Sequence, residues 1–416
     1  MANENNCNGH FTEDDEMSSY KKDSNLAVTF RILYDTEITG KDFYLSFNPV
    51  MSHQIFGENE SIFGYRSLTI TLNYLHNSAK CYVNIKNSGQ IKSDVHKPDD
   101  IMESLNPWLP ENYVTKEEDF LMLHKTEKHD LIHGKILHEF KDKQKCQLFP
   151  DDEIFSTYKV THCDLTDDNF KSFHSRFETF VIWFIDGANF IDLDDEKWEI
   201  FYVYEEITHP KTQKIYVTPV GYCTVYKFFA YPESIRPRIS QFFILPSHQR
   251  LGLGTALYET VFKVFQSKSE VVDITVEEPT SNFQIIRDIH DCLMVKKSFS
   301  ENLMKVFKSP PKKIFNKMKD MKLGKKQSQR VYNILCCLEA ESSKTTYDQH
   351  LNNIKNKIEK DVKEKMNGIK KARDEAGFEV NMDVISDMKT MIESEFKRYM
   401  EDLEISIKCI KKTLEV

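Results

Sequence analysis

The sequence lacks the patterns that mark several protein classes. Its nine cysteines include no pair spaced as Cys-x-x-Cys, which argues against a disulfide framework or a zinc site and favours reduced thiols. No apolar run approaches the length of a membrane span, and residues 1–24 are too polar and acidic for a signal peptide. No internal repeat is visible. These absences predict a soluble protein of the cell interior.

Charge and composition limit which partners and how many domains we expect. A net charge of −9 argues against a general nucleic-acid binder and leaves room for a basic partner. Hydrophobic content of 40% with 12% aromatic residues is globular, and 416 residues suggest two or three domains at about 150 residues each. We expect a disordered terminus over 1–25, a mixed α/β domain over 26–150, a second domain over 151–298 and lysine-rich helices over 299–416.

Apolar periodicity predicts the main helices and strands. Alternating or continuous β-branched and aromatic residues indicate strands, and apolar steps of three and four indicate helices. The expected strands span 27–33, 68–74, 81–85, 157–161, 198–204, 215–226, 239–245 and 271–276, and the expected helices span 170–190, 281–293 and 384–414. The strands at 68–74 and 81–85 are expected to form a hairpin, and those from 198 to 245 an antiparallel meander. The basic run at 305–330 is expected to be an exposed helical face.

The stretch after the 239–245 strand carries the first functional signal. Pro246 closes the strand, Gly252 and Gly254 follow, and an amphipathic helix begins at once. Two glycines at a strand-to-helix turn let the backbone approach a ligand and direct N–H groups at an anion such as a diphosphate. The signal is weak alone, because Gly-x-Gly commonly marks only a turn, and both the P-loop and the dinucleotide pattern are missing.

The pattern Gln-x-x-Gly-x-Gly at 249–254 resembles the coenzyme A pyrophosphate loop of the GNAT acetyltransferases. A meander, this helix and one further strand also follow the element order of that superfamily. The resemblance implies an α+β fold, the acyl-CoA N-acyltransferase fold, with a mixed α/β N-terminal domain and a helical C-terminal region.

Acetyl transfer to an amine needs a base, because a lysine with an ordinary pKa of about 10.4 must lose a proton before it attacks. Glu277, at the end of the 271–276 strand, is the best-placed carboxylate, and the neighbouring Glu278 strengthens it. A solvated acid at a strand end is the alternative interpretation of Glu277.

Longer motifs narrow the resemblance to one family. They are QIFGENESIFGY (54–65), FIDGANFIDLDDEKW (184–198), VGYCTVY (220–226), RPRISQ (236–241), DITVEEP (273–279) and RVYNIL (330–335). Together these segments resemble the type B histone acetyltransferase catalytic subunits. The match spans roughly 26–340 and is densest over 178–290.

The resemblance implies roles for particular residues. Glu277 would be the general base, with Glu278 where the family usually has Asp and Asp186 where it has a longer Glu. Acetyl-CoA would lie along Phe242, Phe243, Ile244, Gln249, Arg250, Leu251, Gly252, Leu253, Gly254, Thr255 and Asn282. The substrate tail would pass Glu58, Asn59, Glu60, Trp198, Tyr226, Lys227 and Phe228. No metal is implied.

Simpler interpretations stand beside these roles. Trp198 is more often a core aromatic than a ligand contact, and Tyr226 and Phe228 can be alternate faces of a strand. The acids at 192–196 are expected to be a solvated loop, which would still attract a basic tail. His248, beside the glycine loop, is expected to be a surface histidine.

The resulting hypothesis is a lysine acetyltransferase that acts on the N-terminal tail of free, newly made histone four by direct attack in a ternary complex. The resemblance implies a WD-repeat histone chaperone as partner, residence in nucleus and cytoplasm, and no direct contact with nucleic acid or membrane. Two alternatives stay open: a GNAT enzyme with another amine substrate, or a non-catalytic histone-binding scaffold. The C-terminal helices are interpreted as a regulatory or docking portion.

Overall fold

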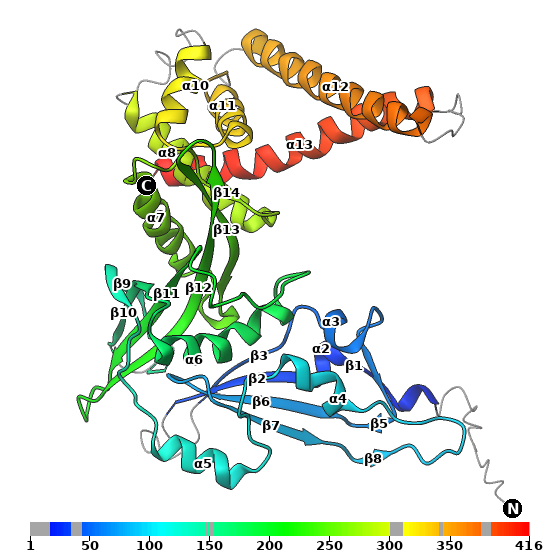
Figure 1. The fold of residues 1–416 in the computed structure, drawn as a ribbon, viewed down its shortest axis with the longest axis vertical. Helices are drawn as coiled ribbons and strands as arrows, with labels where there is room; N and C mark the ends of the chain where they lie inside the picture. The colour runs from blue at the N-terminus through cyan, green and yellow to red at the C-terminus, as the bar shows by residue number, and fades with distance from the viewer. Residues whose placement is uncertain are drawn as a thin grey trace, which may run out of the picture. The chain divides into compact units, whose positions relative to one another are not determined.

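The computed structural model describes residues 17–34, 44–146, 148–149, 153–299, 311–340, 344–375 and 384–415. These residues divide into two compact units (Figure 1). The first unit comprises residues up to 227 together with 239–260, and the second comprises 228–238 together with 261–416. The predicted segments 151–298 and 299–416 therefore each contribute to the second unit.

The first unit opens with a four-stranded sheet in the order β3-β2-β6-β7. Its strands are β2 (Val28–Leu33), β3 (Tyr44–Phe47), β6 (Thr69–Leu75) and β7 (Cys81–Lys86). β2 and β6 run parallel, and β6 and β7 pair antiparallel as the predicted hairpin. Short elements complete this part: α2 (Ser24–Ala27), α3 (His53–Phe56), α4 (Ile101–Leu105) and α5 (Glu117–Lys125), with β5 (Tyr65–Arg66) paired to β8 (Gly89–Gln90).

The expectation of disorder over residues 1–25 is wrong at its C-terminal end. Lys21–Asp23 form β1, which pairs antiparallel with β4 (Ser61–Phe63). Asp23 also caps α2 by accepting a hydrogen bond from the backbone N–H of Leu26. Low apolar content did not forbid order here, because a partner strand supplies the backbone hydrogen bonds. Residues 1–16 lie outside the described residues.

A second sheet in the first unit has the strand order β13-β12-β11-β10-β9. Its strands are β9 (Lys135–Lys145), β10 (Phe155–Cys163), β11 (Trp198–Thr208), β12 (Ile215–Ala230) and β13 (Ser234–Ile244). The predicted run of consecutive strands is confirmed in this order. β9 was not predicted, and the expected boundary at residue 150 separates it from its partner β10. Its charged sequence hides it, because an edge strand with exposed side chains has little apolar alternation.

Phe170 and its neighbours form a shorter helix than predicted. α6 (Asp168–Phe177) ends in a 3-10 helix, η2 (Glu178–Trp183), whereas the prediction extended to residue 190. All six residues of η2 are buried, so its apolar side chains continue the run without continuing the α-helical period. Phe30 of β2 packs against the rings of Phe180 and Trp183, and the Phe180 ring stacks on Phe243 of β13, so these aromatics join the two sheets.

The second unit is mostly helical. It contains β14 (Thr275–Val276), α8 (Ser281–Ser298), α10 (Pro311–Asp320), α11 (Lys325–Ala340), α12 (Lys344–Glu375) and α13 (Val384–Glu415). The predicted 271–276 strand is reduced to β14, with isolated bridges at Val271 and Ile274, and the predicted last helix is confirmed. α12 and α13, orange and red in Figure 1, contact each other and converge where α12 ends and α13 begins.

Three further expectations can be compared with the described residues. The eight described cysteines are free, in agreement with the expected reduced thiols. Among the described helices, none is both long and apolar enough to cross a membrane. In the basic run, Lys317 and Lys322 donate to the backbone carbonyls of Ser298 and Val271, whereas Lys312 and Lys313 are exposed.

Candidate functional site

The glycine loop follows the end of β13 in the first unit. A 3-10 turn, η3 (Pro246–His248), leads through the loop into α7 (Leu253–Gln266), so the predicted strand, turn and helix are confirmed. The side chain of Gln249 donates to the carbonyl of Ile244 at 3.0 Å and holds the loop against the strand. Arg250 and Gly252 both have positive φ, 66° and 82°. Left-handed backbone at these positions turns the chain sharply into the helix.

The space at Gly252 suits an anionic group. A Cβ built on Gly252 would meet nothing within 4 Å, and the loop precedes the first turn of α7. The first N–H groups of an α-helix have no partner within the helix, and its N-terminus carries a positive partial charge. The loop therefore offers open space and backbone donors together, as a diphosphate requires.

The strand beside the loop is held by a close backbone approach. A Cβ on Gly221 of β12 would clash with the carbonyl oxygen of Phe243, so only glycine fits there. The Phe243 ring is buried and packs 5.3 Å from the Phe184 ring, measured between centroids. Any contact of Phe243 with a cofactor is therefore made through its backbone, while Phe242 is only half-buried.

The candidate base lies in the second unit. Glu277 and Glu278 directly follow β14 and are both exposed, and Glu278 has a positive φ of 33°. Thr280 then caps α8 by accepting from the backbone N–H of Phe283 at 3.3 Å, and Asn282 is exposed in the first turn. The strand end and the helix start thus present two carboxylates and an amide to solvent within six residues.

Asp186 and Glu60 are linked through a histidine that the sequence analysis did not single out. His53 Nε2 lies 3.0 Å from Asp186 Oδ1, and His53 Nδ1 lies 3.8 Å from Glu60 Oε1. Glu60 also accepts from the backbone N–H groups of Ser52 and His53, and the Ser52 hydrogen bond does most to hold its pKa below the usual range. The Asp186 side chain is 79% exposed. Glu60, by contrast, has a structural role, because it holds the backbone at Ser52 and His53.

Trp198 and Tyr226 form one aromatic pair. They face each other across β11 and β12, with ring centroids 4.9 Å apart and an edge-to-face arrangement. The Tyr226 hydroxyl donates to Asp195 Oδ2 at 2.9 Å, which connects the pair to the acidic loop. Both rings are half-buried, so the pair presents part of its surface to solvent.

Lys227 and Phe228 are engaged within separate units. Lys227 Nζ donates to Glu199 Oε1 at 3.0 Å, and Glu199 also bonds His162. Burial raises the pKa of Glu199, but these two partners outweigh it and hold the value at about 2. In the second unit, the Arg238 guanidinium lies 4.5 Å above the Phe228 ring. Glu58 and Asn59 are exposed in the turn before Glu60.

The expectation that His248 is a surface residue is wrong. His248 is buried, and its Nε2 lies 3.0 Å from Oε2 of Glu205, which is also buried. Ser156 donates to the other oxygen of Glu205 at 2.6 Å. Burial would raise the pKa of Glu205, but His248 and the hydrogen bonds bring it below its usual value. The sequence places His248 beside an exposed loop, but it does not show that Glu205, a buried acid on β11, is its partner.

Comparisons with known proteins agree with this geometry. A family model described as "Histone acetyl transferase HAT1 N-terminus" matches residues 20–186, and one described as "Acetyltransferase (GNAT) family" matches residues 157–284. The chain is 30% identical over 398 residues to the histone acetyltransferase type B catalytic subunit of Homo sapiens, covering 93% of each chain. The Mus musculus subunit matches over the same shares at 30%, and that of Cryptococcus neoformans is 32% identical over 59% of this chain and 62% of its own.

The chain belongs to the family of type B histone acetyltransferase catalytic subunits. It is an acetyltransferase of the GNAT fold class, and enzymes of this class use acetyl-CoA. The open space at Gly252 and the start of α7 fit the pyrophosphate of that cofactor. When bound, acetyl-CoA supplies an acyl group activated as a thioester.

Several residues of this type B acetyltransferase that the structure brings together were not singled out from the sequence. His53 directly precedes the recognised segment 54–65, so its neighbours signalled it. Asp288 and Ser406 gave no signal, and although Arg330 begins the motif RVYNIL, its pairing with Asp288 was not predicted, because these residues come from three separate helices and meet only in the folded chain. The glycine loop from Gln249 to Thr255 belongs to the first unit, and Glu277 and Asn282 belong to the second.

Proposed function

We propose that the protein acetylates lysines in the N-terminal tail of free, newly made histone four, using acetyl-CoA. Membership of the type B family carries this proposal and makes a histone the expected substrate. Exposed Glu58, the half-buried Trp198 and Tyr226 rings and the acids around Asp195 support a basic peptide as the partner.

The mechanism is direct attack in a ternary complex with Glu277 as general base. Glu277 takes the proton from the substrate ammonium, which makes the amine nucleophilic. The N–H groups at the start of α7 hold the cofactor's diphosphate, and Gly252 leaves room for it. A covalent enzyme route has little support, since seven of the eight described cysteines are buried, and burial raises the pKa of the Cys223 thiol.

Asp186 and Glu278 are proposed as supporting carboxylates. Asp186 is exposed and bonded to His53, so a water between it and the substrate amine compensates for its short side chain. Glu278 directly neighbours the base. Asn282 and the loop from Gln249 to Thr255 are proposed as cofactor contacts, and Lys227 and Phe228 as contacts of the tail.

The test compares Glu277→Gln with the wild type on a histone-four tail peptide. We expect kcat to fall about 100-fold or more, in line with loss of a general base. Glu270→Gln is the matched control, because Glu270 is an exposed carboxylate of the same unit just before Val271. Equal rates for Glu277→Gln and the wild type would remove the base assignment.

The same assay separates the alternative functions. Faster turnover of a polyamine or of a peptide α-amine than of the histone tail would favour another amine substrate. Cofactor binding by calorimetry without turnover on any histone peptide would favour a histone-binding scaffold.

The cellular setting is also a proposal. We expect a WD-repeat histone chaperone to bind the enzyme, with residence in both nucleus and cytoplasm and no direct contact with nucleic acid. Co-purification with a WD-repeat protein from both cell fractions supports this, and a stable complex with DNA at physiological salt contradicts it.

A further inference from the structure

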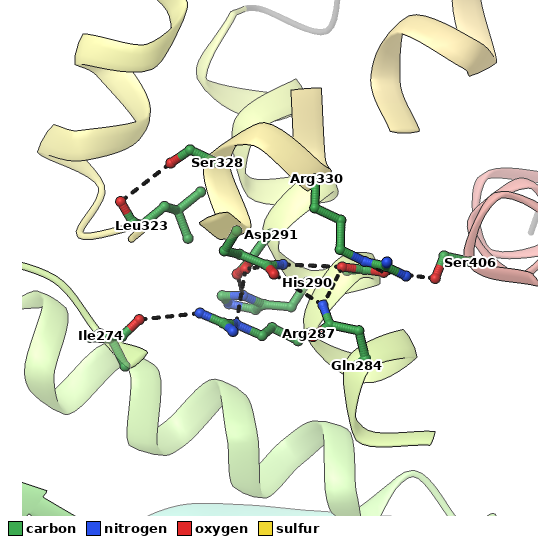
Figure 2. A network of polar contacts seen from close by, with 11 residues as sticks. Ile274, Gln284, Arg287, His290, Asp291, Leu323, Ser328, Arg330 and Ser406 are labelled. Carbon is green, nitrogen blue, oxygen red and sulfur yellow. Dashed lines mark hydrogen bonds and ion pairs between the residues drawn. The ribbon is translucent and has the colours of Figure 1, made fainter. Parts of the chain in front are cut away.

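Asp288 of α8 is the centre of a buried polar cluster in the second unit. The side chain is fully buried, and its two oxygens accept four hydrogen bonds. The donors are Gln284 at 2.7 Å, Gln327 at 3.1 Å, Arg330 at 2.7 Å and Ser406 at 2.7 Å. Gln327 and Arg330 belong to α11 and Ser406 to α13, as Figure 2 shows for Arg330 and Ser406. One carboxylate therefore joins three helices.

A second buried carboxylate extends the cluster along α8. Asp291 Oδ2 accepts from Gln327 at 3.0 Å, and Arg287 Nε lies 3.8 Å from the same oxygen. The Arg287 guanidinium also donates to the backbone carbonyl of Ile274 at 3.2 Å (Figure 2). Ile274 is three residues before Glu277. The cluster thus reaches from the C-terminal helices to the segment that carries the proposed base.

The turn between α10 and α11 holds the same segment. The backbone N–H of Ile274 donates to the Lys322 carbonyl at 2.9 Å, and Lys322 Nζ donates to the Val271 carbonyl at 2.6 Å. Ile274 and Leu323 form a parallel bridge, and Ser328 of α11 donates to the Leu323 carbonyl. The C-terminal region therefore supplies hydrogen-bond partners to the backbone of Val271 and Ile274, just before β14.

We propose that Asp288 is a positioning residue, through which α11 and α13 fix the strand end carrying Glu277 and the helix start carrying Asn282. The inference rests on the proposed role of Glu277 as base. A buried carboxylate with a guanidinium partner and three further donors is rigid, because every oxygen is already bonded. Removing its charge loosens contacts to both C-terminal helices at once. The C-terminal helices are in this view a part of the catalytic unit.

The role is distinguishable from simple stabilisation. A base must sit within hydrogen-bond reach of the amine, and a misplacement of about 1 Å at the site, caused by a mutation far from it, can lower a rate about 100-fold. A positioning role therefore lowers kcat and leaves the KM for histone nearly unchanged. It also disappears once Glu277 is removed, because there is then no base to misplace.

The test uses the full-length protein with purified core histones and acetyl-CoA. Asp288→Asn is expected to lower kcat about tenfold or more, with KM within about twofold. Ser406→Ala removes a single hydrogen bond and is expected to give a smaller loss, which keeps the test open if Asp288→Asn folds poorly. Ser394→Ala is the matched control, the same change at an exposed position of α13.

Two further measurements decide the outcome. Hydrogen exchange over residues 274–283 should be faster in Asp288→Asn and Ser406→Ala than in the control, and unchanged exchange overturns the proposal. In a Glu277→Gln background, Asp288→Asn should lower kcat no further, and multiplicative losses also overturn it. Wild-type kcat in Glu277→Gln instead refutes the base, while the exchange data still decide whether the cluster holds the segment.

Discussion

His53 Nε2 lies 3.0 Å from Asp186 Oδ1, and the other ring nitrogen of His53 lies 3.8 Å from Glu60. One imidazole therefore connects a carboxylate proposed to support catalysis with one proposed to contact the substrate. Glu60 is fixed by backbone N–H groups, whereas Asp186 is 79% exposed and has this histidine as its partner. The histidine thus orients the more exposed of the two acids.

Asp186→Ala is expected to lower kcat by about threefold to tenfold, far less than Glu277→Gln. The reason is that an exposed acid held by one histidine assists the reaction without taking the proton itself. His53→Ala should give a similar loss, and the double variant no more than either, because residues that act together are not additive. Steady-state kinetics on a histone-four tail peptide measure this. Fully multiplicative losses would show that the two side chains act separately.

Gly252→Ala is expected to raise the KM for acetyl-CoA several-fold. The added methyl group occupies the open space at the loop, and a positive φ of 82° adds about 1–2 kcal/mol of backbone strain. Gly57→Ala is the matched control, because Gly57 has a φ of 78° and equally open surroundings. Both variants should lose similar stability, and only Gly252→Ala should change the acetyl-CoA KM. Equal KM values would place the diphosphate elsewhere.

The elements predicted correctly are those whose residues carry their own pattern. The hairpin at 69–86 alternates cleanly, and α13 has a continuous apolar stripe, so local sequence defined both. β9 and β1 were missed, because their order depends on pairing with β10 and β4. A polar strand gains its backbone hydrogen bonds by pairing with a neighbouring strand, and its own sequence pattern does not reveal that pairing.

The candidate site divides in the same way. The glycine loop and the Glu277 strand end could be identified from contiguous motifs, and the structure places each at the expected end of its element. The tertiary contacts around these two segments could not be identified from the sequence. His248 and Glu205 are 43 residues apart, and Asp288 and Ser406 are 118 apart, so their pairing is a tertiary contact without a local signature.

His248→Ala is expected to destabilise the protein by about 3–5 kcal/mol. The change removes the imidazole from the buried Glu205 carboxylate, which keeps the Ser156 hydroxyl as a donor, and a buried charge that loses a partner is strongly destabilising. Urea denaturation at neutral pH measures the loss. Adding Glu205→Gln to His248→Ala removes the charge and should recover part of the stability. A double variant less stable than His248→Ala alone would mean that Glu205 has other essential partners.

Glu178→Gln is expected to change how stability depends on pH. Burial raises the pKa of Glu178 to about 8, and burial lowers the pKa of the neighbouring His174 to about 3. Their closest atoms, His174 Nε2 and Glu178 Oε2, are 3.8 Å apart, which is too far for a hydrogen bond. Both side chains are therefore neutral near pH 7, and the contact is not an ion pair.

The sign follows from the direction of each shift. Because folding raises the pKa of Glu178, its contribution is fully present below about pH 4.5 and is lost as the pH rises towards 8. At pH 8 the wild type should have lost up to about 4 kcal/mol from this group, and Glu178→Gln should not show this loss. His174 acts in the opposite direction, because its lowered pKa makes protonation unfavourable as the pH falls below about 6.5.

Glu196→Gln is the control for this prediction, because Glu196 is an exposed carboxylate in the loop that follows. Urea denaturation at pH 5, 6.5 and 8 should show the free energy of unfolding of the wild type and of Glu196→Gln falling together as the pH rises. The free energy of unfolding of Glu178→Gln should fall less, so that its difference from the wild type grows with pH. The backbone N–H of Ile191 donates to Glu178 at 3.3 Å. A glutamine oxygen can accept the same hydrogen bond, so the variant keeps this contact. Parallel curves for all three proteins would mean that Glu178 is ionised in the folded state, and the proposed neutral pair would then be wrong.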